Sequence, residues 1–124
     1  MTTRRDAPRL GALESQVMEL LWDGGPSTIR ELIESLPGSP AYTTIATVLT
    51  NLQRKGLAAS RKKGRSTVYR ASCTREQHVA SMMSDALGSS RDRAASILHF
   101  AESMPESELD LLRDFLAQRD GGAP

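Results

Sequence analysis

The feature that most limits the fold lies in residues 42–72, where a helical apolar stripe is followed at once by two β-like runs. The stripe recurs at three- and four-residue spacing, which predicts an amphipathic helix over residues 42–55. Its inward members are Ile45, Val48, Leu49 and Leu52. Gly56 is expected to end this helix as a left-handed C-cap. The runs 57–63 and 66–72 then predict a short β-hairpin.

Two shorter amphipathic segments come before this helix. Residues 10–22 have apolar side chains at helical spacing and end at a Gly-Gly-Pro sequence. Ser27 or Thr28 is expected to cap the second segment, Thr28 forms the pattern of a capping box with Glu31, and the segment ends before Pro37. The order helix, helix, helix, hairpin is that of a winged helix-turn-helix. The third helix is then expected to enter a DNA major groove, and the hairpin is the wing.

The second half of the chain predicts three further helices and no strand. They are expected over about 74–87, 91–103 and from Pro105 onward, so the fold class is mostly α with a small β-hairpin wing. We expect a winged-helix DNA-binding domain at 1–73 and a helical dimerisation domain at 74–124, because three short helices cannot easily build a core alone. The apolar side chains expected at the dimer interface are Val79, Met82, Met83, Leu87, Ile97, Leu98, Leu109, Leu112, Phe115 and Leu116.

The near-neutral net charge of +1 hides a strong asymmetry between the two halves. Residues 1–73 hold eleven basic and six acidic side chains, whereas residues 74–124 hold five basic and nine acidic ones. Between Glu34 and Glu76 there is no acid but eight Lys or Arg. A positive field of one sign over such a length is typical of a surface that binds a polyanion.

Two kinds of side chain are candidates for contacting DNA. Basic residues would neutralise phosphates, and these candidates are Arg54, Lys55, Arg61, Lys62, Lys63, Arg65 and Arg70. Short polar groups on the third helix would contact bases or phosphates, and these are Tyr42, Thr43, Thr44, Thr47, Thr50 and Asn51. Arg65 at the tip of the wing suits a narrow minor groove. Thr43 or Thr44 could instead cap the helix, and Tyr42 could instead pack at the helix entry.

Other functional classes have weaker support in the sequence. Cys73 is the single cysteine, and His78 and His99 lack metal-ligand spacing, so we expect no metal, no cofactor and no enzymatic activity. Trp22 and the pair Met82-Met83 are expected in the core. No membrane-spanning run or signal peptide is recognisable, so a cytoplasmic protein without membrane insertion is expected. The alternative functions are a winged-helix protein-interaction module and a repressor of the same fold that answers a different signal.

Three segments carry a resemblance to a known family. They are residues 13–22 (LExxVMxxLW), 41–57 (AYTTIATVLTNLxxKGL) and 64–69 (GRxxVY). The chain thereby resembles the BlaI/MecI/CopY family of penicillinase repressors, with the similarity concentrated in residues 10–72. The second segment is the most specific of the three.

The resemblance implies a homodimeric repressor on an inverted-repeat operator of the TACA/TGTA type, of β-lactam-resistance or cell-wall-stress genes. It implies Thr43, Thr44 and Thr47 as contacts from the recognition helix, and Arg65 from the wing. Some family members are cut at an Asn-Phe bond after a membrane sensor protease is activated. The corresponding pair here is His99-Phe100, in which histidine replaces asparagine. The paired Cys-x-Cys motifs of copper-sensing members are not present.

Overall fold

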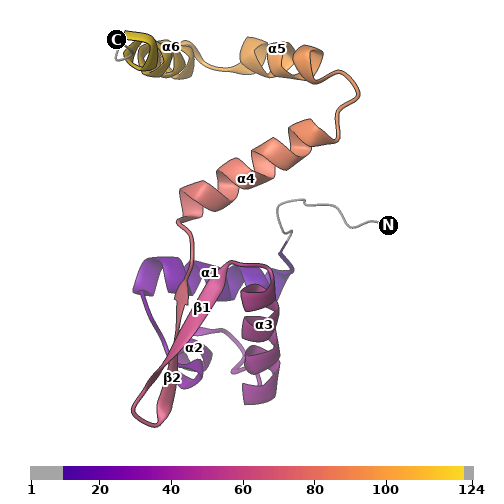
Figure 1. Ribbon diagram of the computed structural model, residues 1–124. Coiled ribbons are helices and arrows are strands. Elements are labelled where there is room, and N and C mark those ends of the chain that lie inside the picture. The colour runs from indigo at the N-terminus through magenta and orange to yellow at the C-terminus, as the bar shows by residue number, and fades with distance from the viewer. Residues whose placement is uncertain (1–9, 122–124) are drawn as a thin grey trace. The chain divides into compact units, whose positions relative to one another are not determined.

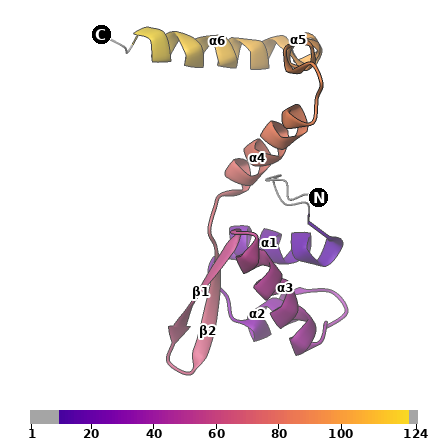
Figure 2. The same cartoon turned by 45° about the vertical axis from the view of Figure 1, so that its right-hand side comes forward.

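The computed structural model describes residues 10–121 (Figures 1 and 2). The chain divides into two compact units after Ser84, and each is described by itself. The helices are α1 (Ala12–Gly24), α2 (Ile29–Ser35), α3 (Tyr42–Arg54), α4 (Arg75–Gly88), α5 (Arg93–Ser103) and α6 (Glu106–Gly121), and the strands are β1 (Ala58–Lys63) and β2 (Ser66–Ala71). The predicted fold class, mostly helical with one β-hairpin, is confirmed.

Local capping interactions set several of these boundaries as the sequence predicts. Thr28 accepts a hydrogen bond from the backbone of Glu31, whose carboxylate accepts one from Thr28 N. Gly56 follows α3 with a φ of 80°, in the left-handed region. The N-cap of α3 is Ala41, without a side-chain hydrogen bond. The alternative that Thr43 or Thr44 caps this helix is therefore wrong, because the helix begins before either residue.

The core of the first unit is aliphatic and is built by the first three helices and the base of the hairpin. Its buried members are Val17, Met18, Leu21, Ile29, Leu32, Leu36, Ile45, Val48, Leu49, Leu52, Leu57 and Ala58. The whole predicted inward stripe of α3 lies in this cluster. Burying one such side chain stabilises the fold by roughly 1.5–3 kcal/mol, so α3 is firmly anchored on one face and its opposite face is free for another role.

Backbone pairing between the hairpin and the turn that follows α1 connects the hairpin to the helices. β1 and β2 pair antiparallel, with Ala58 opposite Ala71 and Lys63 opposite Ser66. Ser27, in the turn between α1 and α2, exchanges two backbone hydrogen bonds of 2.9 and 2.8 Å with Tyr69. Pairing of this kind holds the base of the hairpin against the helical core, while its tip extends beyond it (Figure 1).

The second unit consists of the end of α4 followed by α5 and α6. Asp92 caps α5 by accepting a hydrogen bond of 3.0 Å from Ala95 N. No side chain of α5 or α6 that the structure describes is buried. Between residues 10 and 121, no helix is both long and apolar enough to cross a bilayer.

The predicted domain boundary after residue 73 stays a prediction, because compactness alone does not define a functional domain. The boundary between compact units falls inside α4, so the first turns of this helix belong to the same unit as the winged helix. The outermost residues of the predicted domains, 1–9 and 122–124, lie outside the described residues.

Candidate nucleic-acid interface

The exposed face of α3 is lined with short hydroxyl side chains. Thr43, Thr47, Thr50 and Arg54 lie opposite the buried stripe, and all four are exposed. Four threonines within one helix are poor helix formers, so the packing of the opposite face must maintain the helix. Thr44 is exposed at the edge of the same face. This surface offers short hydrogen-bonding groups and methyl groups, which are the kinds of group that contact base edges in a major groove.

The threonine hydroxyls differ in whether they are already engaged. Thr50 Oγ1 donates to Ala46 O at 3.0 Å within the helix. Arg54 Nη1 donates to Asn51 Oδ1 at 2.8 Å, so these two side chains hold each other on the helix surface. In the described part of the chain, no hydrogen bond engages the hydroxyl of Thr47. Thr47 therefore keeps its full donor and acceptor capacity for a partner.

The register of the hairpin separates the basic side chains of the wing onto two faces. Side chains alternate along a strand and directly opposed residues share a face, so Lys62 shares a face with Ser60. Gln53 of α3 donates a hydrogen bond of 3.0 Å to Ser60, which shows that this face is turned toward α3. The basic residues on the other face are Arg61, Lys63 and Arg70. Of the basic side chains on the strands, only Lys62 is thus on the α3 side.

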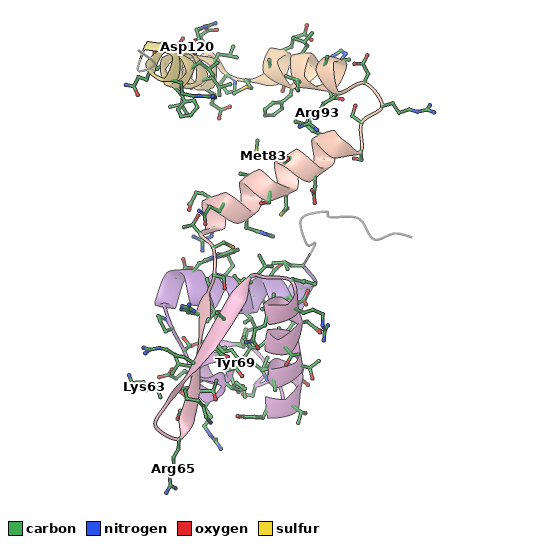
Figure 3. The ribbon with its side chains drawn as sticks, viewed as in Figure 1. Lys63, Arg65, Tyr69, Met83, Arg93 and Asp120 are labelled. Atoms are coloured by element: carbon green, nitrogen blue, oxygen red, sulfur yellow. The ribbon has the colours of Figure 1, made fainter. Side chains whose placement is uncertain are left out.

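The start of α3 and the tip of the wing lie at the same end of the first unit, away from α1 (Figures 1 and 2). Gly64 turns the hairpin with a φ of 63°. Arg65 follows it and extends outward from the tip (Figure 3). Tyr42 at the start of α3 is 52% exposed. This exposure leaves its hydroxyl accessible for the predicted phosphate contact, and packing at the helix entry stays the alternative.

Lys55 is engaged with the first helix. Its Nζ lies 2.9 Å from Oε1 of Glu14, which links the end of α3 to the start of α1. Burial raises the pKa of the Glu14 carboxyl, but the hydrogen bond from Lys55, the backbone hydrogen bond from Gly11 and the Lys55 charge outweigh burial and lower this pKa. The Lys55 ammonium thus has an intramolecular role besides the predicted contact with DNA.

Sequence reasoning missed a cluster around Trp22 at the end of α1. Trp22 Nε1 donates to Cys73 O at 2.8 Å, Arg75 lies over the indole ring, and His78 packs beside it. The available signal was the spacing of Glu19, Trp22 and Asp23, which puts all three on one helix face. Burial raises the pKa of the Cys73 thiol. A raised thiol pKa is opposite to what a cysteine nucleophile needs.

Most of the predicted dimer-interface side chains are exposed in the single chain. Val79, Met82 and Met83 are exposed on α4. At 43% and 53% exposure, Met82 and Met83 do not belong to the core of the chain, so that expectation is wrong. Leu87 and Leu109 are half-buried. The remaining exposed side chains of the predicted set are Ile97, Leu98, Leu112, Phe115 and Leu116. Phe100 and Leu111 are also exposed and had not been assigned to the interface.

Comparison with known proteins places these features in a family. The sequence profile described as "Penicillinase repressor" matches residues 10–118. The transcriptional regulator BlaI of Mycobacterium tuberculosis is 38% identical over 120 residues, which cover 92% of this chain and 87% of that protein.

Two solved structures share the fold. The solution structure of the DNA-binding domain of the repressor BlaI aligns with a TM-score of 0.50 at 28% identity, over 56% of this chain and 88% of that one. The crystal structure of the transcriptional regulator Tm0710 from Thermotoga maritima aligns with a TM-score of 0.50 at 14% identity, over 90% of this chain and 74% of that one. At such low identity the second similarity shows the fold alone.

Proposed function

The chain belongs to the penicillinase repressor family and is a transcriptional regulator with a DNA-binding domain rather than an enzyme, and from this premise we propose that it represses transcription as a homodimer on an inverted-repeat operator. The observation that carries the proposal is geometric. The start of α3, which carries Thr43 and Thr44, and the tip of the wing lie at one end of the same compact unit (Figure 1). A helix in the major groove and a wing on the adjacent backbone can then contact one duplex together.

The proposed roles follow from where each side chain lies. Thr43, Thr44 and Thr47 contact base edges, since they are exposed and short. Tyr42, Thr50, Asn51 and Arg54 extend this surface, and the basic residues of the wing neutralise phosphates. Lys62 on the α3 side and Arg65 at the tip are the first of these to reach a duplex on which α3 lies. Arg61, Lys63 and Arg70 on the far face contribute mainly through the general positive field.

The homodimer is supported by the apolar side chains that α4, α5 and α6 leave exposed. Isolated helices of this length are marginal in water unless an apolar face is packed. A second copy of the chain presents the same apolar side chains, so an isologous interface would bury both sets at once. The acidic excess of residues 74–124 fits this division of roles, because it disfavours contact between this lobe and DNA.

The regulated genes and the derepressing signal also belong to the proposal. From the family membership, we propose that the protein is cytoplasmic, that it regulates genes of β-lactam resistance or cell-wall stress, and that a membrane sensor protease controls it. The bond between His99 and Phe100 lies inside α5. Because proteases preferentially cut exposed loops, cleavage at this bond would require local unfolding of the helix.

A titration of the purified protein into a labelled duplex with inverted TACA/TGTA repeats tests the function. We expect the apparent Kd to rise by about three orders of magnitude between 50 and 200 mM salt if about six phosphates are contacted. A duplex with scrambled repeats should bind far more weakly at every salt concentration. Failure to bind any duplex in a salt-dependent way would refute the proposal.

Thr47→Val tests which face recognises the bases, because valine keeps the shape of threonine and removes the hydroxyl. We expect a loss of preference for the intact repeat over single-base variants, with a change of about 1–3 kcal/mol at the contacted position. Thr50→Val makes the same chemical change on the same helix face, but the Thr50 hydroxyl already donates to Ala46 O, so we expect a smaller loss of base preference from this variant. An unchanged base preference in Thr47→Val would show that another face of α3 recognises the bases.

A further inference from the structure

Trp22 is the centre of a group of contacts between the end of α1 and the chain that leaves the wing. Its indole N–H donates to Cys73 O at 2.8 Å. The guanidinium carbon of Arg75 lies 5.2 Å from the centre of the indole ring, within the range of a cation–π interaction. The ring of His78 lies 5.9 Å from that of Trp22, and His78 is only 7% exposed. The linker and the first turn of α4 are thus fixed to one side chain of α1.

Two carboxylates of α1 complete this group. Arg75 forms ion pairs with Glu19 and with Asp23, and its Nη2 lies 2.8 Å from Asp23 Oδ1. Hydrogen bonds to Glu19 and then to Asp23 raise the pKa of Arg75 above its ordinary value. The positive charge also lies near the last turn of α1, where the helix dipole favours a cation. We call Glu19, Trp22, Asp23, Arg75 and His78 the α1–α4 latch.

The energetic value of the latch for folding alone is limited. Exposed ion pairs contribute little to stability, and Arg75, Glu19 and Asp23 are all substantially exposed. The main effect of such a set is to restrict geometry. A planar guanidinium that is bound by two carboxylates and lies over an indole ring has few alternative positions. The latch therefore restricts the orientation of the first turn of α4 on the end of α1.

The orientation of α4 on α1 sets how two surfaces of the same compact unit are oriented relative to each other. The first surface is the hydroxyl face of α3. The opposite face of this helix packs on the same hydrophobic core as α1. The exposed side chains of Val79, Met82 and Met83 lie on the turns of α4 that directly follow the latch. All of these residues precede the unit boundary after Ser84. A change in the latch would therefore rotate the DNA-contacting surface relative to the apolar face of α4.

We propose that the α1–α4 latch determines the operator spacing that the repressor accepts, by fixing the recognition helix relative to the apolar face of α4. The inference rests on the proposed homodimer function. In a two-fold dimer, the separation of the two recognition helices is set by how each is attached to the shared interface, and half-site spacing follows from that geometry. Arg75 is then a positioning residue for specificity and contacts no DNA itself.

The test measures binding of the full-length protein to duplexes whose inverted TACA/TGTA half-sites differ in separation. One added base pair turns the second half-site by about a tenth of a helical turn. We expect the wild-type protein to prefer its best spacing by about tenfold or more over spacings changed by two base pairs. In Arg75→Ala this preference should fall to about threefold or less, while affinity for a duplex with a single half-site stays within about twofold.

Arg113→Ala is the matched control. Arg113 also pairs with two carboxylates, Glu106 and Asp110, but all three side chains lie on α6. This variant loses the same charge and the same number of acidic partners without touching the latch. It should therefore retain the wild-type spacing preference. Arg75→Lys keeps the charge but loses the planar, two-partner geometry, so its preference should lie between those of wild type and Arg75→Ala.

The single cysteine provides a readout that is independent of DNA. Cys73 lines an open cleft of about 470 Å³ together with Trp22 and Arg75. Opening the latch should expose this thiol and relieve the burial that suppresses its ionisation. We expect Cys73 in Arg75→Ala to react with a thiol reagent several-fold faster than in wild type or Arg113→Ala.

The possible outcomes separate the inference from the function on which it rests. A reduced spacing preference in Arg75→Ala, together with unchanged affinity for a single half-site, supports the proposed role of the latch. An unchanged spacing preference in Arg75→Ala, even with faster Cys73 labelling, overturns it and leaves the repressor function intact. Absence of binding by the wild-type protein overturns both. If Arg75→Ala does not fold, the double variant Glu19→Gln with Asp23→Asn replaces it in the same comparison. This variant keeps Arg75 and removes the charges of its two acidic partners.

Discussion

The winged-helix unit and the last two helices differ in whether their apolar side chains are buried within the chain. In the first unit, three helices and a hairpin enclose a continuous aliphatic core. In α5 and α6, no described side chain is buried, although Leu98, Leu111 and Phe115 are more than half exposed. The same chain therefore contains one region with a core of its own and another whose described helices leave their apolar side chains exposed. This difference agrees with the proposed division of roles, in which the first region contacts DNA and the second assembles the homodimer.

Separating the two regions should give the largest effect. A fragment of residues 1–84 retains the whole buried core and should show cooperative unfolding by circular dichroism. A fragment of residues 85–124 should be mostly unfolded at micromolar concentration, because helices of this length without a packed face are marginal. A stably helical, monomeric 85–124 fragment would contradict the comparison.

Truncating one leucine in each region should sharpen the contrast. Leu49 is fully buried in the core, so Leu49→Ala should lower the free energy of unfolding by about 3–5 kcal/mol in urea denaturation. Leu112 is exposed on α6, and Leu112→Ala should leave the unfolding free energy of the winged-helix unit unchanged in the full chain while weakening its self-association. Sedimentation at several concentrations measures that weakening. A Leu112→Ala protein with wild-type self-association would place the interface elsewhere.

Substitutions on the wing should affect DNA binding without affecting assembly. Lys62 faces α3 and Lys63 faces away from it, so the two residues form a matched pair of the same chemistry. We expect Lys62→Ala to weaken binding to all duplexes alike and to reduce the slope of log K against log salt by about one. Lys63→Ala should have the smaller effect. The opposite order would mean that the duplex lies against the outer face of the hairpin.

Patterns within single elements could be predicted from the sequence, whereas interactions between elements could not. The stripe of α3, the capping box at Thr28 and the left-handed Gly56 each depend on neighbours within a few residues, and all three predictions are confirmed. The Trp22–Arg75 contact joins residues more than fifty positions apart. No periodicity signals it, since either side chain alone is ordinary on a helix surface.

In the candidate site too, features within one element could be predicted and features that depend on two elements could not. The hydroxyl face of α3 followed from helical spacing, and its exposure agrees with the prediction. Lys62 and Lys63 could not be distinguished in advance, because the distinction depends on strand register and on the hydrogen bond between Gln53 and Ser60. The sequence also left Met82 and Met83 with two expected locations, the core and the dimer interface, because an apolar stripe has the same pattern whether it packs within a chain or against a second one.

The smallest expected effect concerns one ion pair in each region. Glu14 is 15% exposed and bonded to Lys55 across two helices, whereas Glu106 is 74% exposed and pairs with Arg113 on its own helix. Glu14→Gln should lower stability at pH 7 by up to about 1 kcal/mol, and Glu106→Gln should lower it less. Because folding lowers the pKa of Glu14, its contribution is complete above the pKa of the unfolded chain and is lost as the pH falls through the folded value. Urea denaturation between pH 3 and 7 should therefore show the wild-type and Glu14→Gln stabilities converging at the acid end, and parallel curves would mean that the Glu14 pair does not stabilise the fold.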